Sequence, residues 1–460
     1  MDQRYDIIVI GSGPGGYVAA IRAAQCGKRV AIVEKADAGG VCLNWGCIPT
    51  KALVRSAQVF ADCKAAATYG VAIEGEVKPD WTKMVERERT VASTMNKGVQ
   101  FLLKKNNIDV IAGFGRLKAQ DTVEVEGVDY EADHIILATG ARPRVMPFMP
   151  IDGKHIISSK EALVLPELPE TMVVVGSGAI GSEFAYIYAT MGVKVTIVEY
   201  MPQIMPLEDE DTAKAMERAF RKLRATVMTS TTVKSVAVRE DGKCDVVIEG
   251  KKGEQTLEAD VVLSAVGIKS NIEDMGLEEL GIEIERDKIK VDEHYKTNLD
   301  GVYAIGDIIA TPALAHVASA EAIHCVEHIC GLNPEAVDYS TIPSCIFTSP
   351  EVASVGMTEA QVKAAGIEYK IGKFPYTASG KATAAGERDG FVKLIFDAEE
   401  KLLGAHFVGH NVTEMIGEPT LAKVLGVSAH RIARTIHAHP SMHEAVMEAA
   451  EDALGCAIHM

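Results

Sequence analysis

The chain has 460 residues, of which 47% are hydrophobic and 24% charged, so it is long enough for about three ordinary globular domains. Its formal net charge of -17 argues against binding to nucleic acid or to an anionic membrane, because both need a basic surface. No apolar stretch reaches the ~18 residues of a membrane span, and the start has no signal peptide, so a cytoplasmic protein is expected.

The first predicted element is a dinucleotide-binding βαβ unit at residues 5–35. An apolar strand leads into Gly11, Gly13 and Gly16, a helical pattern follows, and a second apolar strand ends at Glu34. Glycines in this pattern let the backbone approach a pyrophosphate at the helix N-terminus, while the acid accepts hydrogen bonds from ribose hydroxyls. The strand, glycines, helix and acid together predict a nucleotide site, whereas the glycines alone would be weak evidence.

Two cysteines, Cys42 and Cys47, stand close together in the stretch GGVCLNWGCIPTK. A tight turn between them could bring their Cα atoms within the roughly 4.4–6.8 Å that a disulfide needs. Pro49 suits the first turn of a following helix, which puts Cys47 at the helix N-terminus, where the dipole favours a thiolate. A zinc site would need two further ligands, and cytoplasmic disulfides are usually catalytic, so a redox pair is favoured over a metal site or a structural disulfide.

The remaining cysteines are expected to do no chemistry. Five of them are interpreted as isolated, serving as buried apolar fillers or as bystanders: Cys26, Cys63, Cys244, Cys345 and Cys456. Farther along, His324 and His328 share a predicted helix face, flanked by Cys325 and Cys330. A metal site there would lack a second group of ligands, so a packed helix is the favoured interpretation.

The βαβ pattern recurs at residues 171–200, with the same internal spacings. Its glycines are Gly176, Gly178 and Gly181, and its acid is Glu199. Two such units predict two nucleotide sites in one chain.

Each unit closes with an apolar strand and a glycine, Gly140 in the first copy and Gly267 in the second. The distance from the first fingerprint glycine to this closing glycine is 129 residues in the first copy and 91 in the second. The first copy therefore carries an insertion, most of it after Glu34, that contains the cysteine pair and a polar helical stretch at residues 81–106.

The pattern of elements predicts an α/β fold with two Rossmann-like dinucleotide-binding domains and a C-terminal α+β dimerisation domain. A third apolar strand ends at Gly306 and Asp307, where a carboxylate could reach a polyol or a ribose, and short alternating strands followed by helices begin near residue 342. The expected domains are 1–148, 149–270, 271–341 (completing the first nucleotide site) and 342–460.

A dithiol can exchange electrons with a nicotinamide only through a group that handles both hydride and sulfur chemistry, and a flavin does both. The sequence therefore predicts FAD in the first domain and a nicotinamide nucleotide in the second. Glu199 would repel a 2′-phosphate, and Tyr200 and Met201 follow it instead of arginines, so NAD is favoured over NADP.

His439 is the candidate acid-base group, because thiol-disulfide exchange needs a proton taken from one thiol and returned to another. It precedes Pro440 and stands five residues before Glu444, a carboxylate that could orient its imidazole. His437 is the less favoured base.

The stretch around Cys42 and Cys47 resembles the active-site signature of the pyridine nucleotide-disulfide oxidoreductases. Its LNxGCIP core looks more like the dihydrolipoamide dehydrogenase branch than like glutathione or trypanothione reductases, and the likeness covers essentially the whole chain. Mercuric-ion reductases usually end in adjacent cysteines, whereas Ala457 follows Cys456, and the soluble transhydrogenases of this fold lack the redox pair.

The resemblance implies a homodimeric flavoenzyme in which Cys42 attacks the substrate disulfide and Cys47 is the thiolate in contact with the flavin. It implies that Lys51 lies beside the flavin and pairs with Glu183, and that His439, with Glu444, acts on the disulfide of the other subunit. Further cofactor contacts are expected at Lys51, Gly115, Thr139, Gly140, Asp307 and Ala315 for FAD, and at Gly267 beside the second nucleotide.

The expected partners are lipoyl-bearing subunits of 2-oxoacid dehydrogenase or glycine cleavage systems. The sequence departs from the family pattern at Val41, at Trp45 and within residues 267–271 and 317–322. A non-catalytic flavoprotein that senses redox state through the same disulfide is the alternative, but it would not need the acid-base pair.

Overall fold

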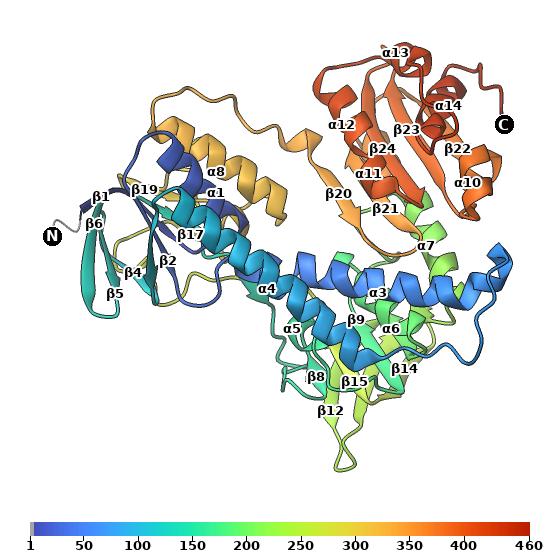
Figure 1. Cartoon of the computed structure of the whole chain (residues 1–460), viewed down its shortest axis with the longest axis horizontal. Coiled ribbons are helices and arrows are strands. Elements are labelled where there is room, and N and C mark those ends of the chain that lie inside the picture. Colours follow the sequence, from blue (N-terminus) through green and yellow to red (C-terminus); the bar gives the residue numbers. More distant parts are fainter. Residues whose placement is uncertain (1–3) are drawn as a thin grey trace. The chain divides into compact units, whose positions relative to one another are not determined.

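The computed structural model describes residues 4–460, which form two compact units (Figure 1). Within the described chain, unit 1 comprises residues 4–53, 82–144 and 267–337, and unit 2 comprises Val54–Trp81, Val145–Val266 and Asp338–Met460. The bounds of the four expected domains stay predictions.

Unit 1 is built on a seven-stranded sheet in the order β3-β2-β1-β6-β5-β4, with β19 paired to β6. Strands β3, β2, β1, β6 and β19 run parallel, and β4 and β5 are antiparallel. The strands of this sheet are β1 (Arg4–Ile10), β2 (Val30–Glu34), β3 (Asp109–Ala112), β4 (Gly115–Ala119), β5 (Thr122–Val125), β6 (Val128–Leu137) and β19 (Val302–Ala304). Two smaller two-stranded sheets of unit 1 pair β7 (Ala141–Pro143) with β16 (Ile268–Ser270) and β17 (Ile284–Glu285) with β18 (Lys288–Ile289).

The helices of unit 1 explain why its central strands are continuous apolar runs. They are α1 (Pro14–Gln25), α2 (Gly40–Asn44), α3 (Cys47–Ala65) up to Leu53, α4 (Trp81–Lys105) from Thr82, the short 3-10 helix η2 (Gly306–Ile308) and α8 (Ala315–Ile329). Strand β1 is buried from Ile7 to Ile10, as expected of a parallel strand covered on both faces. Helices α1 and α8 lie side by side (Figure 1).

The predicted insertion in the first βαβ unit is confirmed. Helices α2, α3 and α4 all stand between β2 and β3, and α4 matches the predicted polar helix. Helix α3 begins at Cys47, with Pro49 in its first turn, as the sequence predicts.

Unit 2 contains a five-stranded parallel sheet in the order β11-β10-β9-β15-β8 and an antiparallel sheet β12-β13-β14. Strands β9 and β15 are apolar and buried, and together with β13 they enclose a common core. The elements are β8 (Ile156–Ile157), α5 (Ser159–Ala162), β9 (Thr171–Val175), α6 (Ala179–Thr190), β10 (Lys194–Val198), α7 (Glu210–Lys222), β11 (Thr226–Met228), β12 (Thr232–Val238), β13 (Cys244–Gly250), β14 (Gly253–Ala259) and β15 (Val261–Ser264), with the 3-10 helix η1 (Ala66–Tyr69) also in this unit.

The C-terminal part of unit 2 is the predicted α+β region, an antiparallel sheet in the order β20-β21-β24-β23-β22 with helices packed on it (Figure 1). Its buried Lys393 on β23 makes ion pairs with Asp209 and Glu359, both at 2.8 Å. The elements are η3 (Tyr339–Thr341), β20 (Pro343–Ile346), β21 (Glu351–Gly356), α9 (Glu359–Ala364), β22 (Tyr369–Pro375), η4 (Tyr376–Ala378), α10 (Gly380–Ala385), β23 (Phe391–Asp397), β24 (Leu402–Gly409), α11 (Val412–Met415), α12 (Gly417–Val424), α13 (Ala429–Arg434) and α14 (Glu444–Ala453).

Within residues 4–460 no helix is both long and apolar enough to cross a membrane.

Candidate active site

The loop that carries the cysteine pair is held by its own polar groups. Asn44 Nδ2 donates to the carbonyl oxygens of Ala38 at 3.0 Å and Gly40 at 2.9 Å, and Thr50 Oγ1 donates to the Gly46 carbonyl at 2.7 Å. A Cβ at Gly46 would lie 3.0 Å from the Val41 carbonyl oxygen, so a glycine fits this turn best. The turn thereby joins the end of α2, which carries Cys42, to the start of α3, which carries Cys47.

Trp45, one of the departures from the family pattern, has a partner in α4. The Arg89 guanidinium lies over the Trp45 ring, 4.2 Å from its centroid, and Arg89 Nη2 donates to the Asn44 carbonyl at 2.7 Å. A cation over an indole ring is a favourable contact, so this departure anchors the redox loop to α4.

The Cys42 and Cys47 thiols interact with each other and are not joined in a disulfide. The hydrogen bond to Cys47 and the burial of the thiol raise the pKa of Cys42 well above its usual range, because both favour the protonated thiol. Cys42 is half-buried, and Cys47 is exposed at the N-terminus of α3. Cys42 is thus the thiol that keeps its proton, and the helix dipole favours negative charge on Cys47.

The first glycine fingerprint forms a tight loop with an open face. A Cβ at Gly11 would lie 2.4 Å from the Ala138 carbonyl oxygen, and one at Gly16 would lie 1.8 Å from that of Gly11, so neither position accepts a side chain. Gly13 is the N-cap of α1, and in the described part of the chain no atom lies within 4 Å of a Cβ built there. The loop therefore leaves room for a phosphate at the N-terminus of α1.

Glu34 ties this loop to the end of β2. Its Oε2 accepts from the Ser12 N–H at 2.9 Å and from Ser12 Oγ at 2.6 Å, and its Oε1 accepts from the Ala36 N–H at 2.9 Å. Ser12, which sequence reasoning missed, is buried and sets the position of the carboxylate.

The other residues expected to contact the first nucleotide lie at the ends of strands and helices of unit 1. Thr139 and Asn271 exchange two hydrogen bonds, of 2.6 and 3.0 Å, just before Gly140. Asp307 stands in η2 after β19, where burial raises the pKa of its carboxyl, and Ala315 opens α8. Gly115 begins β4, and a Cβ there would lie 3.1 Å from the Ile10 and Val33 side chains, so its glycine serves close packing.

The second fingerprint repeats the same construction in unit 2. A Cβ added at Gly176 would lie 2.4 Å from the Ala265 carbonyl oxygen, and a Cβ added at Gly181 would lie 2.0 Å from the Gly176 carbonyl oxygen. At Gly178, the N-cap of α6, an added Cβ would meet open space. Glu199 Oε2 accepts from the Ser177 N–H at 2.8 Å and from Ser177 Oγ at 2.7 Å, the counterpart of the Ser12–Glu34 pair. The signal for both serines was in the sequence, because serine is the second residue of both fingerprints.

A cavity of about 450 Å³ lies over this second loop. It brings together fingerprint glycines, the acid that follows β10, and Ala265 and Val266, which follow the closing strand β15. Its lining is Phe148, Val175, Gly176, Ser177, Gly178, Val198, Glu199, Tyr200, Pro206, Thr231, Thr232, Val233, Ala265 and Val266. Gly267 follows the last of these residues and adopts a φ of 109°.

The two residues of the predicted acid-base pair contact each other. His439 Nδ1 lies 2.8 Å from Glu444 Oε1, and Glu444 Oε2 accepts from the Ser441 N–H at 2.8 Å. Burial acts to raise the pKa of Glu444, but the Ser441 N–H and His439 outweigh it and lower that pKa, so the carboxylate is charged. The His439 side chain is 79% exposed, so its Nε2 edge is open to a substrate.

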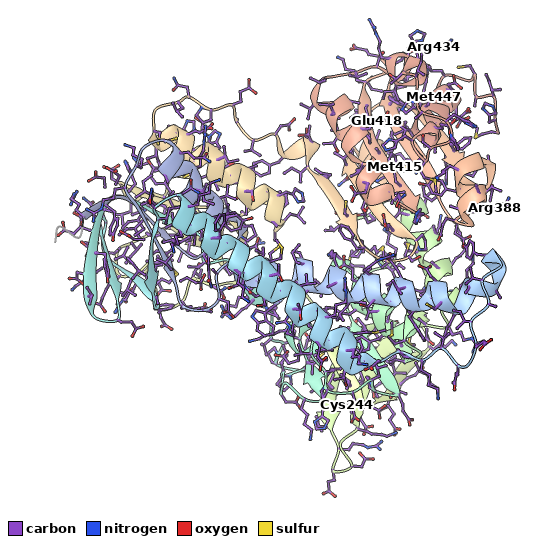
Figure 2. The ribbon with its side chains drawn as sticks, viewed as in Figure 1. Cys244, Arg388, Met415, Glu418, Arg434 and Met447 are labelled. Carbon is purple, nitrogen blue, oxygen red and sulfur yellow. The ribbon has the colours of Figure 1, made fainter. Side chains whose placement is uncertain are left out.

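Glu418 of α12, labelled in Figure 2, holds the histidines that stand before and after His439 in the sequence. Its two carboxylate oxygens lie 2.7 Å from His437 Nε2 and 2.7 Å from His443 Nδ1. The hydrogen bond to Glu418 raises the pKa of His437, whose other ring nitrogen lies 2.9 Å from the Thr435 carbonyl oxygen. With both nitrogens engaged, His437 is poorly placed to act as a base.

Lys51 follows Cys47 on α3, and Glu183 lies on α6, where it is buried. Glu183 Oε1 accepts from the Phe347 N–H at 3.0 Å. The pairing of Lys51 with Glu183 stays a prediction.

One interpretation of the other cysteines is wrong. Cys26 is not isolated, because its thiol interacts with that of Cys330. Cys456 is exposed, so of its two expected roles the exposure fits a bystander and not a buried filler. In the described residues no group of His, Cys, Asp or Glu is arranged to hold a metal. His324 is buried on α8. Its Nε2 lies 3.0 Å from His294 Nδ1, and its Nδ1 lies 2.9 Å from the Glu335 carbonyl oxygen.

Comparison with known families identifies the class of protein. Residues 5–322 match the pyridine nucleotide-disulphide oxidoreductase family, and residues 342–450 match the dimerisation domain of that family. The chain belongs to the pyridine nucleotide-disulphide oxidoreductases, and the second match supports a homodimer.

Several relatives that match over the full length are named dihydrolipoyl dehydrogenase. The chain is 47% identical to the dihydrolipoyl dehydrogenase of Chlorobaculum parvum, covering 98% of this chain and 97% of the relative. It is 43% identical to the dihydrolipoyl dehydrogenase of Bacillus subtilis, with all of both chains covered. The crystal structure of LpdA from Mycobacterium tuberculosis superposes with a TM-score of 0.90 at 27% identity, covering 97% of this chain and 99% of that one.

Membership of this family implies that the chain binds FAD and a pyridine nucleotide. The residues present fit both groups, because each fingerprint leaves its middle glycine, Gly13 or Gly178, open at a helix N-terminus. A side chain at either glycine would project into that open space.

Proposed function

We propose that this protein is a dihydrolipoyl dehydrogenase, which oxidises protein-bound dihydrolipoyl groups with NAD⁺ through the Cys42–Cys47 disulfide. The observation that carries the proposal is the interacting pair of thiols on α2 and at the start of α3, in the same unit as the first glycine fingerprint. The names of the full-length relatives support the same activity.

The cysteine pair would take electrons from the substrate by two thiol-disulfide exchanges. One substrate thiolate attacks the Cys42 sulfur, which forms a mixed disulfide and releases Cys47 as a thiolate. The second substrate thiolate attacks the substrate sulfur that is bonded to Cys42 in the mixed disulfide, which closes the lipoyl ring and releases Cys42 as a thiolate. The position of Cys47 at the N-terminus of α3 suits the thiolate that leaves first. Bound FAD would supply the two-electron link from the dithiol to the nicotinamide.

His439 would take the proton from the attacking substrate thiol and return it in the reverse direction. Glu444 holds Nδ1 of the imidazole at 2.8 Å, which leaves Nε2 for the substrate. In a homodimer this His439 would serve the disulfide of the other subunit, so we expect an isolated monomer to be inactive.

Glu199 would make the second site selective for NAD. Its carboxylate is buried at the edge of the cavity over α6, where it would accept from a ribose diol and repel a 2′-phosphate. Tyr200, which also lines the cavity, and Met201 offer no positive charge to offset that repulsion.

The partners we propose are lipoyl-bearing subunits of 2-oxoacid dehydrogenase or glycine cleavage systems, met in the cytoplasm. The lipoyl group on its flexible arm would carry the reducing equivalents to the enzyme.

Anaerobic steady-state turnover tests the proposal. The purified FAD-loaded protein is given dihydrolipoamide with NAD⁺ in one assay and glutathione disulfide with NADPH in another. Rapid NADH formation in the first assay alone is expected. Activity only in the second would overturn both the substrate and the nucleotide, and silence in both would favour a redox sensor over an enzyme.

A further inference from the structure

Helices α1 and α8 pack side by side in unit 1, and two contacts show that they run in the same direction (Figure 1). Near their beginnings, Gly15 of α1 meets Ala318 of α8, where a Cβ on Gly15 would lie 3.3 Å from the Ala318 carbonyl oxygen. Near their ends, Arg22 Nε donates to Glu327 Oε1 at 3.0 Å, and Arg22 Nη2 lies 2.5 Å from the same oxygen.

One further turn along each helix stands a cysteine. Cys26 comes four residues after Arg22 and is the C-cap of α1, and Cys330 comes three residues after Glu327 and is the C-cap of α8. The register set by the ion pair therefore brings the two cysteines together, and their thiols do interact. Both cysteines are partly exposed, so a small reagent could reach them.

We propose that Cys26 and Cys330 are a second redox-active pair, which forms a disulfide that staples the C-terminal ends of α1 and α8. The co-reactant is a low-molecular-weight disulfide. Nothing in this inference depends on the proposed turnover of dihydrolipoyl groups.

The exchange has a defined order. Burial and the neighbouring Cys26 raise the pKa of Cys330 to about 11, so Cys330 is the poorer nucleophile and attacks second. The Cys26 thiolate attacks the small disulfide, forms a mixed disulfide and releases one small thiol. Cys330 then gives up its proton and attacks the Cys26 sulfur, which releases a second small thiol. The two electrons and two protons of the cysteine pair end on the two small thiols.

The staple would act on the helices that frame the first nucleotide loop. Helix α1 begins directly after Gly13, and α8 begins at Ala315, soon after Asp307. Because α1 has 12 residues, about 18 Å separates its glycine loop from Cys26. The bond would thus fix the two helices to each other without touching the cysteine pair of the active site.

Peptide mapping of the full-length Cys42→Ser/Cys47→Ser protein tests the inference, because this background removes the active-site thiols. The protein is incubated with hydroxyethyl disulfide, its remaining thiols are alkylated without reduction, and its peptides are analysed by mass spectrometry. The expected result is a cross-linked pair of peptides containing Cys26 and Cys330, lighter than the two reduced peptides by two hydrogen atoms. Separate hydroxyethyl adducts or alkyl groups on both cysteines, with no cross-link, would overturn the proposal.

Matched variants make the assignment specific. Adding Cys26→Ser should abolish the cross-linked peptide, whereas adding Cys63→Ser, a partly exposed cysteine on α3, should leave it unchanged. The same oxidation should raise the Tm of the Cys42→Ser/Cys47→Ser protein by several degrees and leave the Tm of the Cys26→Ser variant unchanged. An unchanged Tm in the cross-linked protein would show that the bond does not staple the helices. The mapping of the parent protein decides the pairing even if a variant fails to fold.

Discussion

Gly178→Ala should separate the binding role of the second glycine loop from its structural role. Gly178 is the N-cap of α6, with φ of −65° and ψ of −172°, an extended conformation that alanine adopts without strain. In the described part of the chain no atom lies within 4 Å of the added methyl group. The variant should therefore fold normally, with a loss of at most about 1 kcal/mol from the weaker N-cap.

The effect on the nucleotide should be much larger. The methyl group would stand where the pyrophosphate approaches the N-terminus of α6, and would cost at least one charge-assisted hydrogen bond from a backbone N–H. Such a bond contributes roughly 1.5–3 kcal/mol, which corresponds to a rise of about 10- to 150-fold in the KM for NAD⁺.

Gly181→Ala is the matched control, because the same substitution three residues later meets backbone. Alanine in a helix gains about 1 kcal/mol over glycine from helix propensity. At Gly181 the new Cβ would lie 2.0 Å from the Gly176 carbonyl oxygen, so the loop and helix must move apart at a cost of roughly 1–3 kcal/mol or more. The steric cost wins, and this variant should melt at a lower temperature.

Thermal melting and steady-state kinetics with varied NAD⁺, at saturating dihydrolipoamide, measure both variants. The reasoning is refuted if Gly178→Ala keeps the parent KM for NAD⁺, or if Gly181→Ala melts at or above the parent temperature.

Three further predictions concern the cysteine pair, the His439–Glu444 pair and the His437–Glu418 ion pair. Replacing either Cys42 or Cys47 with serine should abolish NADH formation from dihydrolipoamide, while FAD absorbance per chain stays at the parent level; residual turnover near the parent rate would rule out the disulfide mechanism. His439→Gln should lower kcat by about 100- to 10,000-fold, the usual contribution of a general base, and Glu444→Gln should lower it less; a His439→Gln rate within a factor of three of the parent would exclude this base. The hydrogen bond to Glu418 raises the pKa of His437 above its ordinary 6.5. The contribution of this ion pair to folding stability is therefore complete below pH 6.5 and is lost as the pH rises through the pKa of His437 in the folded protein. The parent Tm should thus fall with rising pH above about 6.5 more steeply than that of Glu418→Gln, and equal slopes across that window would contradict the pairing.

Local sequence patterns were enough to predict both nucleotide loops. Gly11 and Gly176 come directly after the first strand of each unit and adopt φ of 101° and 95°, which favours glycine, and the start of α3 at Cys47 follows from the proline in its first turn. The His439–Glu444 pair was predictable because its two members stand five residues apart around a loop. Such contacts are short in sequence, so spacing carries most of the information.

Contacts between segments that are far apart in the sequence could not be predicted from local sequence patterns. The pairing of Cys26 with Cys330 depends on how α1 packs on α8, and no spacing links them. Glu418 stands 19 residues before His437, and its role appears only once α12 packs beside the histidine loop. Buried Lys393 likewise meets Asp209 across 184 residues.

The central claim is that Cys42 and Cys47 carry electrons from the substrate to the rest of the enzyme. The most direct test mixes the oxidised, FAD-loaded protein anaerobically with dihydrolipoamide alone, quenches with iodoacetamide and maps the alkylated cysteines. Both Cys42 and Cys47 should become alkylated within the time of one turnover, and adding NAD⁺ before the quench should protect them again. If both cysteines stay unmodified while a full equivalent of substrate is oxidised, the electrons take another route and the account is wrong.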